Sequence, residues 1–471
     1  MSNRISNTFL VIICLTFLSA CKKSFLDQRP YDTVSLDDAI RTEGDMQAAV
    51  NGIYSQLRTS TLYGRDILLR PDVMADNVYI SATNSNRFLE YFQLNYTVST
   101  VSSANTWINA YRAILRANNV INSAVPSNAN TNQLKGEALT LRALMYHELV
   151  KTYSKSYTQG GASTFGVPIV TIYDPNLFPP RNTVDEVYTQ IEKDLTDAIG
   201  LLTARSPYTA AFASKDAAKA ILARVYQFKG DWAKANAMAL DVINNGGFSL
   251  TTTANHVTYW QNSTPRTDKT ESILEIGFDP NGNAGLESLP YFFLQSGYGD
   301  ALAANSLFNI FSATDVRRSL MTDAVRGGVS VKVVNKYPNN INYNTKVIRL
   351  SEVYLIAAEA YYHQSNIPQA LNYLNLIATK RDPSFTGYTS SGTQVLDDIL
   401  LERRKELAFE GHRYWDHARY NLDVLRVNVN NNYPGNVPLN FAASNFRRIL
   451  PIAQNELDAN PNIRSQQNPG Y

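Results

Sequence analysis

Two stretches of this chain, 135 residues apart, repeat the same spacing of small and aromatic side chains. The matching positions are Ala223, Tyr226 and Ala235 in the first stretch and Ala358, Tyr361 and Ala370 in the second. Each stretch predicts a helix, a tight turn at Gly230 or Ser365, and a second helix. The small alanines let the two helices approach closely, and the tyrosine packs as a wedge. This spacing is typical of the tetratricopeptide repeat, so we expect a helical-repeat scaffold with units near residues 214–245 and 349–380.

Most of the remaining sequence carries the three- and four-residue periodicity of amphipathic helices. Thr42-x-x-Asp45 has the form of a capping box, which begins a helix. Two short runs, Ser272–Phe278 and Val329–Val334, predict small β-hairpins. Because the sequence lacks alternating βα units, a Rossmann or barrel fold is not expected. We therefore expect a mainly α fold, with a tetratricopeptide-type helical scaffold, long irregular loops and a few small β-hairpins.

Charge and composition exclude several classes of protein. The 43 lysines and arginines nearly balance 41 acids, so the formal net charge is only +2 and the basic excess of a general nucleic-acid binder is missing. Two cysteines cannot form a disulfide framework or a four-cysteine zinc site. His412 and His417 are five residues apart and lack the spacing of a helical zinc pair. We therefore expect neither a metal nor a cofactor.

The first twenty residues have the features of an export signal. Arg4 precedes an apolar run over residues 9–18, which is too short to span a bilayer. The tetrad Leu18-Ser19-Ala20-Cys21 then resembles a bacterial lipobox. We therefore predict a lipoprotein signal peptide over residues 1–20, with Cys21 acylated as the first mature residue.

Several motifs, in order along nearly the whole mature chain, resemble the SusD/RagB family of Bacteroidetes outer-membrane lipoproteins. They run from Phe25-Leu26-Asp27 near the lipobox to Asn468-Pro469-Gly470-Tyr471 at the chain end. The most specific is the block that begins at Glu402-Arg403 and continues through Glu406, Phe409-Glu410-Gly411 and Arg413 to Trp415-Asp416. The resemblance implies one SusD-like domain over residues 21–471, with an N-terminal part over about 21–330 and a C-terminal part over about 331–471.

The resemblance also implies a function and a location. Members of this family bind glycans, or in some cases peptides, and are not enzymes. They sit over a SusC-like TonB-dependent transporter, with the helical repeats against the transporter and the irregular loops holding the ligand. We therefore expect a lipid-anchored protein of the outer membrane that faces the exterior, captures an oligo- or polysaccharide and delivers it to such a transporter.

Polar residues and aromatic rings on two long loop stretches are the candidate ligand contacts. Sugar rings stack their C–H faces on aromatic rings, and their hydroxyls need polar partners. The candidates are Asp76, Asn77, Tyr79, Arg87, Tyr91 and Tyr96 in the first stretch and Asn283, Tyr291, Gln295 and Tyr298 in the second. The alternative for any one ring is that it only attaches a long loop to the scaffold.

The acidic residues of the most specific block have two interpretations. Glu402, Glu406 and Glu410 share one helical face, as the acid and base of a glycoside hydrolase would. The alternative is a structural ion network, which also includes Arg403, Arg413 and Asp416. Interleaved arginines would keep the carboxylates ionised, which is unsuitable for a general acid, so we favour the network.

Two other functions remain open besides glycan capture and hydrolysis. The lipoprotein could bind peptides at the cell surface, or its repeats could form a groove that binds a segment of a partner protein. Each alternative would replace the glycan with a protein ligand.

Overall fold

The computed structural model describes residues 39–204, 206–427, 432–435 and 437–471. The predicted signal peptide and Cys21 lie outside these residues. Within the described residues, no helix is both long and apolar enough to cross a membrane.

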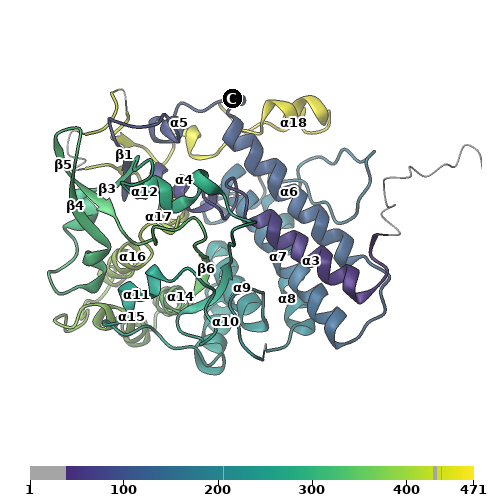
Figure 1. Cartoon of the computed structure of the whole chain (residues 1–471), viewed down its shortest axis with the longest axis horizontal. Helices are drawn as coiled ribbons and strands as arrows, with labels where there is room; N and C mark the ends of the chain where they lie inside the picture. Colours follow the sequence, from purple (N-terminus) through teal and green to yellow (C-terminus); the bar gives the residue numbers. More distant parts are fainter. Residues whose placement is uncertain (1–38, 205, 428–431, 436) are drawn as a thin grey trace, which may run out of the picture.

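Eight helices pack in four consecutive pairs and form the scaffold (Figure 1). The pairs are α3 (Glu43–Leu57) with α6 (Val101–Ile121), α7 (Ala129–Tyr153) with α8 (Val184–Leu201), α9 (Lys215–Lys229) with α10 (Trp232–Asn245), and α14 (Leu350–His363) with α15 (Ile367–Arg381). Each pair also packs against the next one, so the four form a continuous array. This array confirms the predicted mainly α, tetratricopeptide-type fold.

The last two pairs correspond to the repeat found in the sequence. Ala223, Ala235, Ala358 and Ala370 are fully buried, as close helix packing requires. Both tight turns need a left-handed backbone, which Gly230 adopts with a φ of 75° and Ser365 with a φ of 60°. The matched alanines and turns therefore give both units the same hairpin of helices.

Shorter helices and strands fill the long connections between the pairs. The remaining helices are α4 (Asp66–Met74), α5 (Leu89–Gln93), α11 (His256–Gln261), α12 (Leu289–Phe293), α13 (Asn305–Phe308), α16 (Gln394–Glu406), α17 (Arg413–Arg419) and α18 (Gln454–Ala459). Single 3-10 turns are η2 (Tyr157–Gln159), η3 (Gly285–Glu287), η4 (Val316–Leu320), η5 (Phe446–Arg448) and η6 (Arg464–Gln466). The strands are β1 (Val78–Ile80), β2 (Ser272–Ile276), β3 (Ala301–Ala303), β4 (Met321–Arg326), β5 (Val329–Val334), β6 (Thr345–Arg349), β7 (Val424–Leu425) and β8 (Asn440–Phe441).

The strands pair over longer distances than local hairpins would. β4 and β5 do form a hairpin, at the left of Figure 1, and β3 and β1 extend it into a sheet of order β1-β3-β5-β4. However, β2 pairs with the distant β6 instead of with a sequence neighbour. The pairing of β1 with β3 places Tyr79 opposite Leu302, so it brings the two candidate loop stretches together.

Gly411 offers a direct test of this packing. Its φ is 76°, and a Cβ at this position would lie 2.8 Å from the carbonyl oxygen of Ile67 on α4. We expect Gly411→Ala to lower the free energy of unfolding by about 2 kcal/mol or more, because both the strain and the clash act on the folded state.

Gly200→Ala is the matched control, because a Cβ there meets nothing within 4 Å and the residue lies in α8. We expect that change to be neutral or to stabilise by up to about 1 kcal/mol, since alanine favours a helix over glycine. Urea denaturation of both variants measures the difference. Equal stabilities would contradict the packing described at Gly411.

Candidate functional site

The structure divides the ten candidate loop residues into a buried group and a surface group. The buried residues are Asp76, Asn77, Tyr79, Tyr91 and Tyr96, none of which is more than 6% exposed. The residues at the surface are Arg87, Asn283, Tyr291, Gln295 and Tyr298. A ligand at the surface reaches only the second group in this structure, so the burial narrows the predicted set of contacts.

Asp76 and Asn77 attach the first loop stretch to α16 and α17. The Asp76 carboxylate accepts from Arg413 Nε at 2.8 Å and pairs with Arg404 at 3.4 Å. Arg404 Nε also donates to Asn77 Oδ1 at 2.8 Å. Burial opposes the charge on Asp76, but Arg413, His417 and Arg404 hold its pKa well below the usual value. Asp76 is therefore a buried ion-pair partner.

The buried tyrosines pack in the core beneath the loops. The rings of Tyr91 and Tyr96 lie 5.4 Å apart between centroids, and Tyr91 also contacts Phe88 at 5.8 Å. The Tyr91 hydroxyl is 2.7 Å from Ser102 Oγ on α6. Burial raises the pKa of Tyr79 to about 12. All three rings are buried, so none of them is open to a ligand at the surface in this structure.

Arg87, Glu287 and Tyr298 form a connected group at the surface. Arg87 Nη2 lies 2.8 Å from Glu287 Oε1, and its guanidinium carbon is 4.2 Å from the centre of the Tyr298 ring. The Tyr298 hydroxyl donates to the same carboxylate oxygen at 3.2 Å. Arg65 forms a further ion pair with Glu287. Although partial burial opposes the charge, Arg65 and Arg87 keep the pKa of Glu287 below its usual value.

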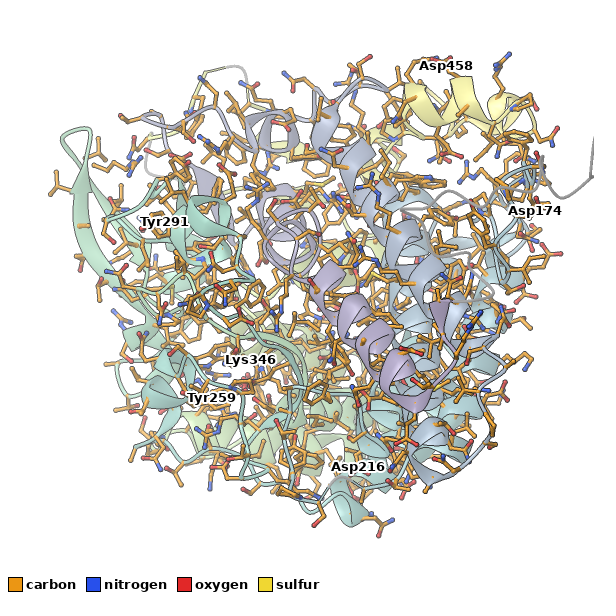
Figure 2. The ribbon with its side chains drawn as sticks, turned by 45° about the vertical axis from the view of Figure 1, so that its right-hand side comes forward. Asp174, Asp216, Tyr259, Tyr291, Lys346 and Asp458 are labelled. Carbon is orange, nitrogen blue, oxygen red and sulfur yellow. The ribbon has the colours of Figure 1, made fainter. Side chains whose placement is uncertain are left out.

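Arg326, at the end of β4, connects this group to the neighbouring loops. Its guanidinium donates to the carbonyl oxygens of Tyr298 and Thr83, each at 2.8 Å. It also reaches Gln295 Oε1 at 3.4 Å. Tyr291 lies beside these residues, because its carbonyl oxygen accepts from the Tyr298 amide at 2.8 Å, and Figure 2 shows it at the edge of the molecule near the β4–β5 hairpin. Asn283 is tied to Asn342 by a side-chain hydrogen bond of 3.0 Å.

We call the surface group of Arg87, Glu287, Tyr291, Gln295, Tyr298 and Arg326 the loop cluster. It combines tyrosine rings with guanidinium, carboxylate and amide groups, which can stack on a sugar and bind its hydroxyls. Sequence reasoning missed Glu287 and Arg326. The available signal for Arg326 was its place directly before the Gly327-Gly328 turn of a hairpin.

The acidic face of α16 lies inside the molecule, in a network of ion pairs. The Glu406 carboxylate forms ion pairs with Arg349 at 2.6 Å, with Arg381 at 3.0 Å and with Arg317 at 3.0 Å. Burial opposes its charge, but these three guanidinium groups hold the pKa of Glu406 well below the usual value. Glu406 is 2% exposed, so neither a substrate nor bulk water reaches it.

The neighbouring acids are paired in the same way. Glu402 pairs with Arg317 at 2.5 Å, and Glu410 pairs with Lys336 at 2.7 Å and with Arg349. Farther along the block, Arg403 lies 3.1 Å from Asp416. Carboxylates that are buried in ion pairs cannot reach a glycosidic oxygen, so this arrangement suits a structural network. Arg413, which was also predicted to belong to this network, pairs instead with Asp76 of the first loop stretch.

Among the residues that the structure describes, no group of three or more His, Cys, Asp or Glu side chains is placed to hold a metal ion.

The protein is therefore a helical-repeat protein of the tetratricopeptide type. Its long loops carry a cluster of polar and aromatic side chains. Two family profiles match the chain. The profile described as "Starch-binding associating with outer membrane" matches residues 24–227, and the profile of the SusD family matches residues 251–471. The chain belongs to the SusD/RagB family, as its motifs indicated.

Individual relatives match over nearly the full length. SusD-like protein P2 of Formosa agariphila is 28% identical over 98% of this chain and 99% of its own. A SusD superfamily protein from Bacteroides thetaiotaomicron is 30% identical, with a TM-score of 0.82 over 91% of this chain and all of its own. Surface glycan-binding protein A from Bacteroides fluxus shares the fold at 20% identity, with a TM-score of 0.74 over 92% of this chain and all of its own.

The ion network generates a stability prediction. Glu406→Gln removes the charge that balances three buried arginines, so we expect the free energy of unfolding to fall by about 3–5 kcal/mol. Asp197→Asn is the control, because its pair with Lys193 lies on the surface and contributes about 1 kcal/mol or less. Urea denaturation compares the two variants, and a similar loss in both would contradict the role of Glu406.

The same network predicts how stability depends on pH. The pKa values of Glu406 and Glu410 are depressed, and that of Glu352, which is paired with Arg224, is lowered to about 2. Below about pH 5 the unfolded chain therefore binds protons that the folded chain does not bind. The stability from these carboxylates is complete above their unfolded pKa of about 4.3 and is lost as the pH falls toward 2. Unfolding measured between pH 7 and pH 3 should show this loss, and constant stability over that range would contradict it.

Proposed function

We propose that this protein is a cell-surface lipoprotein that captures an oligo- or polysaccharide and delivers it to a SusC-like TonB-dependent transporter of the outer membrane. The loop cluster is the proposed capture site, and Cys21 is the proposed point of lipid attachment. Membership of the SusD/RagB family and the starch-binding description of the matching profile support a carbohydrate ligand.

The observation that carries the proposal is the contact among Arg87, Glu287 and Tyr298. Their side chains are already held by hydrogen bonds and an ion pair, so little conformational entropy is lost when a ligand binds. Glu287 stays ionised and can accept hydrogen bonds from sugar hydroxyls. The tyrosines supply aromatic surface, and Gln295 supplies an exposed amide that both donates and accepts.

The acid of the loop cluster and the three acids of the most specific sequence block support binding over hydrolysis. A glycoside hydrolase needs one carboxylic acid that is protonated at neutral pH and can reach the substrate. The pKa of Glu287 is lowered, and Glu402, Glu406 and Glu410 are buried in ion pairs. We therefore assign these acids to binding and to folding, with no catalytic step.

Tyr298→Ala tests the capture site. If the ring stacks on a sugar, removing it should weaken glycan binding by about 1–3 kcal/mol, by analogy with the stacking of bases on aromatic rings. The matched control is Tyr173→Ala, which removes a ring that is 49% exposed on a different loop. Calorimetry of the mature protein against a panel of glycans and oligopeptides measures both variants.

The panel separates the proposed function from its alternatives. We expect saturable binding of at least one glycan without product formation, weakened in Tyr298→Ala and unchanged in Tyr173→Ala. Binding of oligopeptides alone would replace the glycan with a peptide ligand. Turnover of a bound glycan that is lost in Glu406→Gln would contradict the binding role and support the hydrolase.

A further inference from the structure

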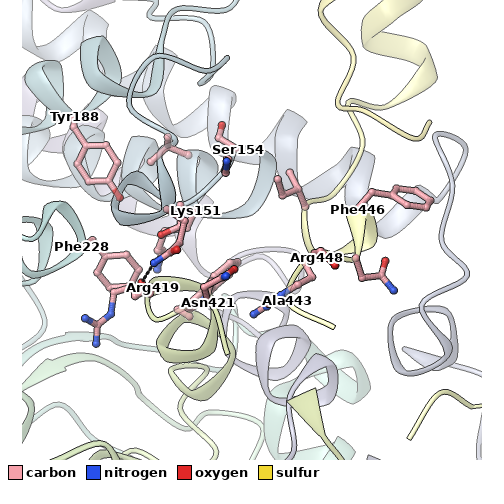
Figure 3. A pocket seen from close by; sticks show the side chains of 18 residues that line it. Lys151, Ser154, Tyr188, Phe228, Arg419, Asn421, Ala443, Phe446 and Arg448 are labelled. Atoms are coloured by element: carbon pink, nitrogen blue, oxygen red, sulfur yellow. Dashed lines mark hydrogen bonds between the residues drawn. The ribbon is translucent and has the colours of Figure 1, made fainter. Parts of the chain in front are cut away.

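The structure contains a cavity of about 420 Å³, which Figure 3 shows from close by. The C-terminal end of α7, the following turn η2, the helix α17 and the segment 443–449 form its walls. None of its lining residues belongs to the loop cluster. Its volume falls within the range of about 300–1,000 Å³ that small-molecule sites occupy.

Four aromatic rings supply the apolar part of the cavity wall. They are Tyr188, Phe228, Trp415 and Phe446 (Figure 3). Lys151 lies between two of them, because its Nζ is 5.5 Å from the ring centres of both Phe228 and Trp415. Phe446 is 42% exposed, which leaves an aromatic surface open to an incoming ligand.

The charged part of the wall is entirely basic. Lys151, Lys155, Arg419 and Arg448 line the cavity, and no Asp or Glu does. Two of these charges are balanced from behind the wall, since Lys151 pairs with Glu148 at 2.9 Å and Arg419 pairs with Glu359 at 2.6 Å.

The other two charges are not balanced. Lys155 and Arg448 make no ion pair with any residue that the structure describes. The cavity therefore carries a positive charge that the described part of the protein does not neutralise.

Two buried polar atoms at the wall also lack a partner. Ser154 is 4% exposed, and its Oγ makes no hydrogen bond within the described residues. The same holds for Arg448 Nη2, whereas Arg448 Nη1 donates to the carbonyl oxygen of Leu422 at 2.9 Å. Neither atom has accessible surface, so a ligand in the cavity meets instead the unbalanced charges of Lys155 and Arg448.

We propose that this cavity is a second ligand site, independent of the loop cluster, which takes a small molecule bearing a carboxylate. The carboxylate lies near the guanidinium of Arg448 and the ammonium group of Lys155, which both line the cavity. The body of the ligand packs against Trp415 and Phe446. A sugar acid and a free organic acid share this chemistry.

Calorimetry with three probes tests the proposal and separates the two sources. Galacturonate and galactose differ only by the carboxylate at one carbon, and adipate carries carboxylates without a sugar ring. We expect the mature protein to bind galacturonate saturably and to bind galactose at least about tenfold more weakly, as the loss of a charge-assisted hydrogen bond implies. Adipate binding as tight as galacturonate binding would still support the carboxylate site and would assign it to free organic acids.

Variants locate the binding in the cavity. Arg448→Gln and the exposed Lys155→Gln should each weaken galacturonate binding by about tenfold, and a melting curve checks that each variant is folded. Lys193→Gln removes a charge elsewhere on the surface and should leave binding unchanged. Tyr298→Ala should also leave it unchanged, which separates this site from the loop cluster.

Three results would overturn the proposal. The first is that neither galacturonate nor adipate binds. The second is that galactose binds the Tyr298→Ala variant, whose loop cluster is weakened, as tightly as galacturonate does. The third is that the folded Arg448→Gln and Lys155→Gln variants both bind with the affinity of the unaltered protein.

Discussion

The buried carboxylate of Glu406 is the interaction on which the rest of the structure depends. The three arginines that contact it come from distant parts of the chain, since Arg317 lies in η4, Arg349 ends β6 and Arg381 ends α15. Such a pairing contributes little net stability compared with an apolar core, but removing one partner leaves unbalanced charge in the interior. The network therefore fixes how the C-terminal helices, the strand pair and the last repeat fit together.

The loops that carry the loop cluster are attached to that network. The residues after Glu406 lead into Arg413, which pairs with Asp76 at 2.8 Å, while Arg404 on α16 holds Asn77. These contacts set the position of the first loop stretch, and the pairing of β1 with β3 joins it to the second. The loop cluster thus lies at the end of a chain of contacts that starts in the interior.

The helical scaffold could be predicted from the sequence because its determinants are local. The alanine and tyrosine spacing, the turn residues and the capping box at Thr42 all act within a few residues, and each appears in the structure. Strand pairing was harder, because β2 joins a strand about seventy residues away. The spacing of the glutamates predicted that they share one helical face. It could not predict their arginine partners at 317, 349 and 381, because those residues are distant in the sequence.

The candidate site could likewise be predicted only in part, because it depends on contacts between distant residues. Tyr91, Tyr96 and Tyr298 all lie in polar stretches of the sequence. The sequence alone gives no reason to prefer one of them as a ligand contact. Burial separates them, and it depends on distant residues, since Tyr96 stacks near Tyr471 at the end of the chain.

Hydrogen–deuterium exchange of the mature protein, with and without its best-binding glycan, tests the central claim most directly. We expect the glycan to slow amide exchange in residues 83–91 and 285–299, while residues 402–410 exchange slowly in both states. Glycan binding with no protection in either loop stretch would contradict the assignment of the loop cluster as the capture site.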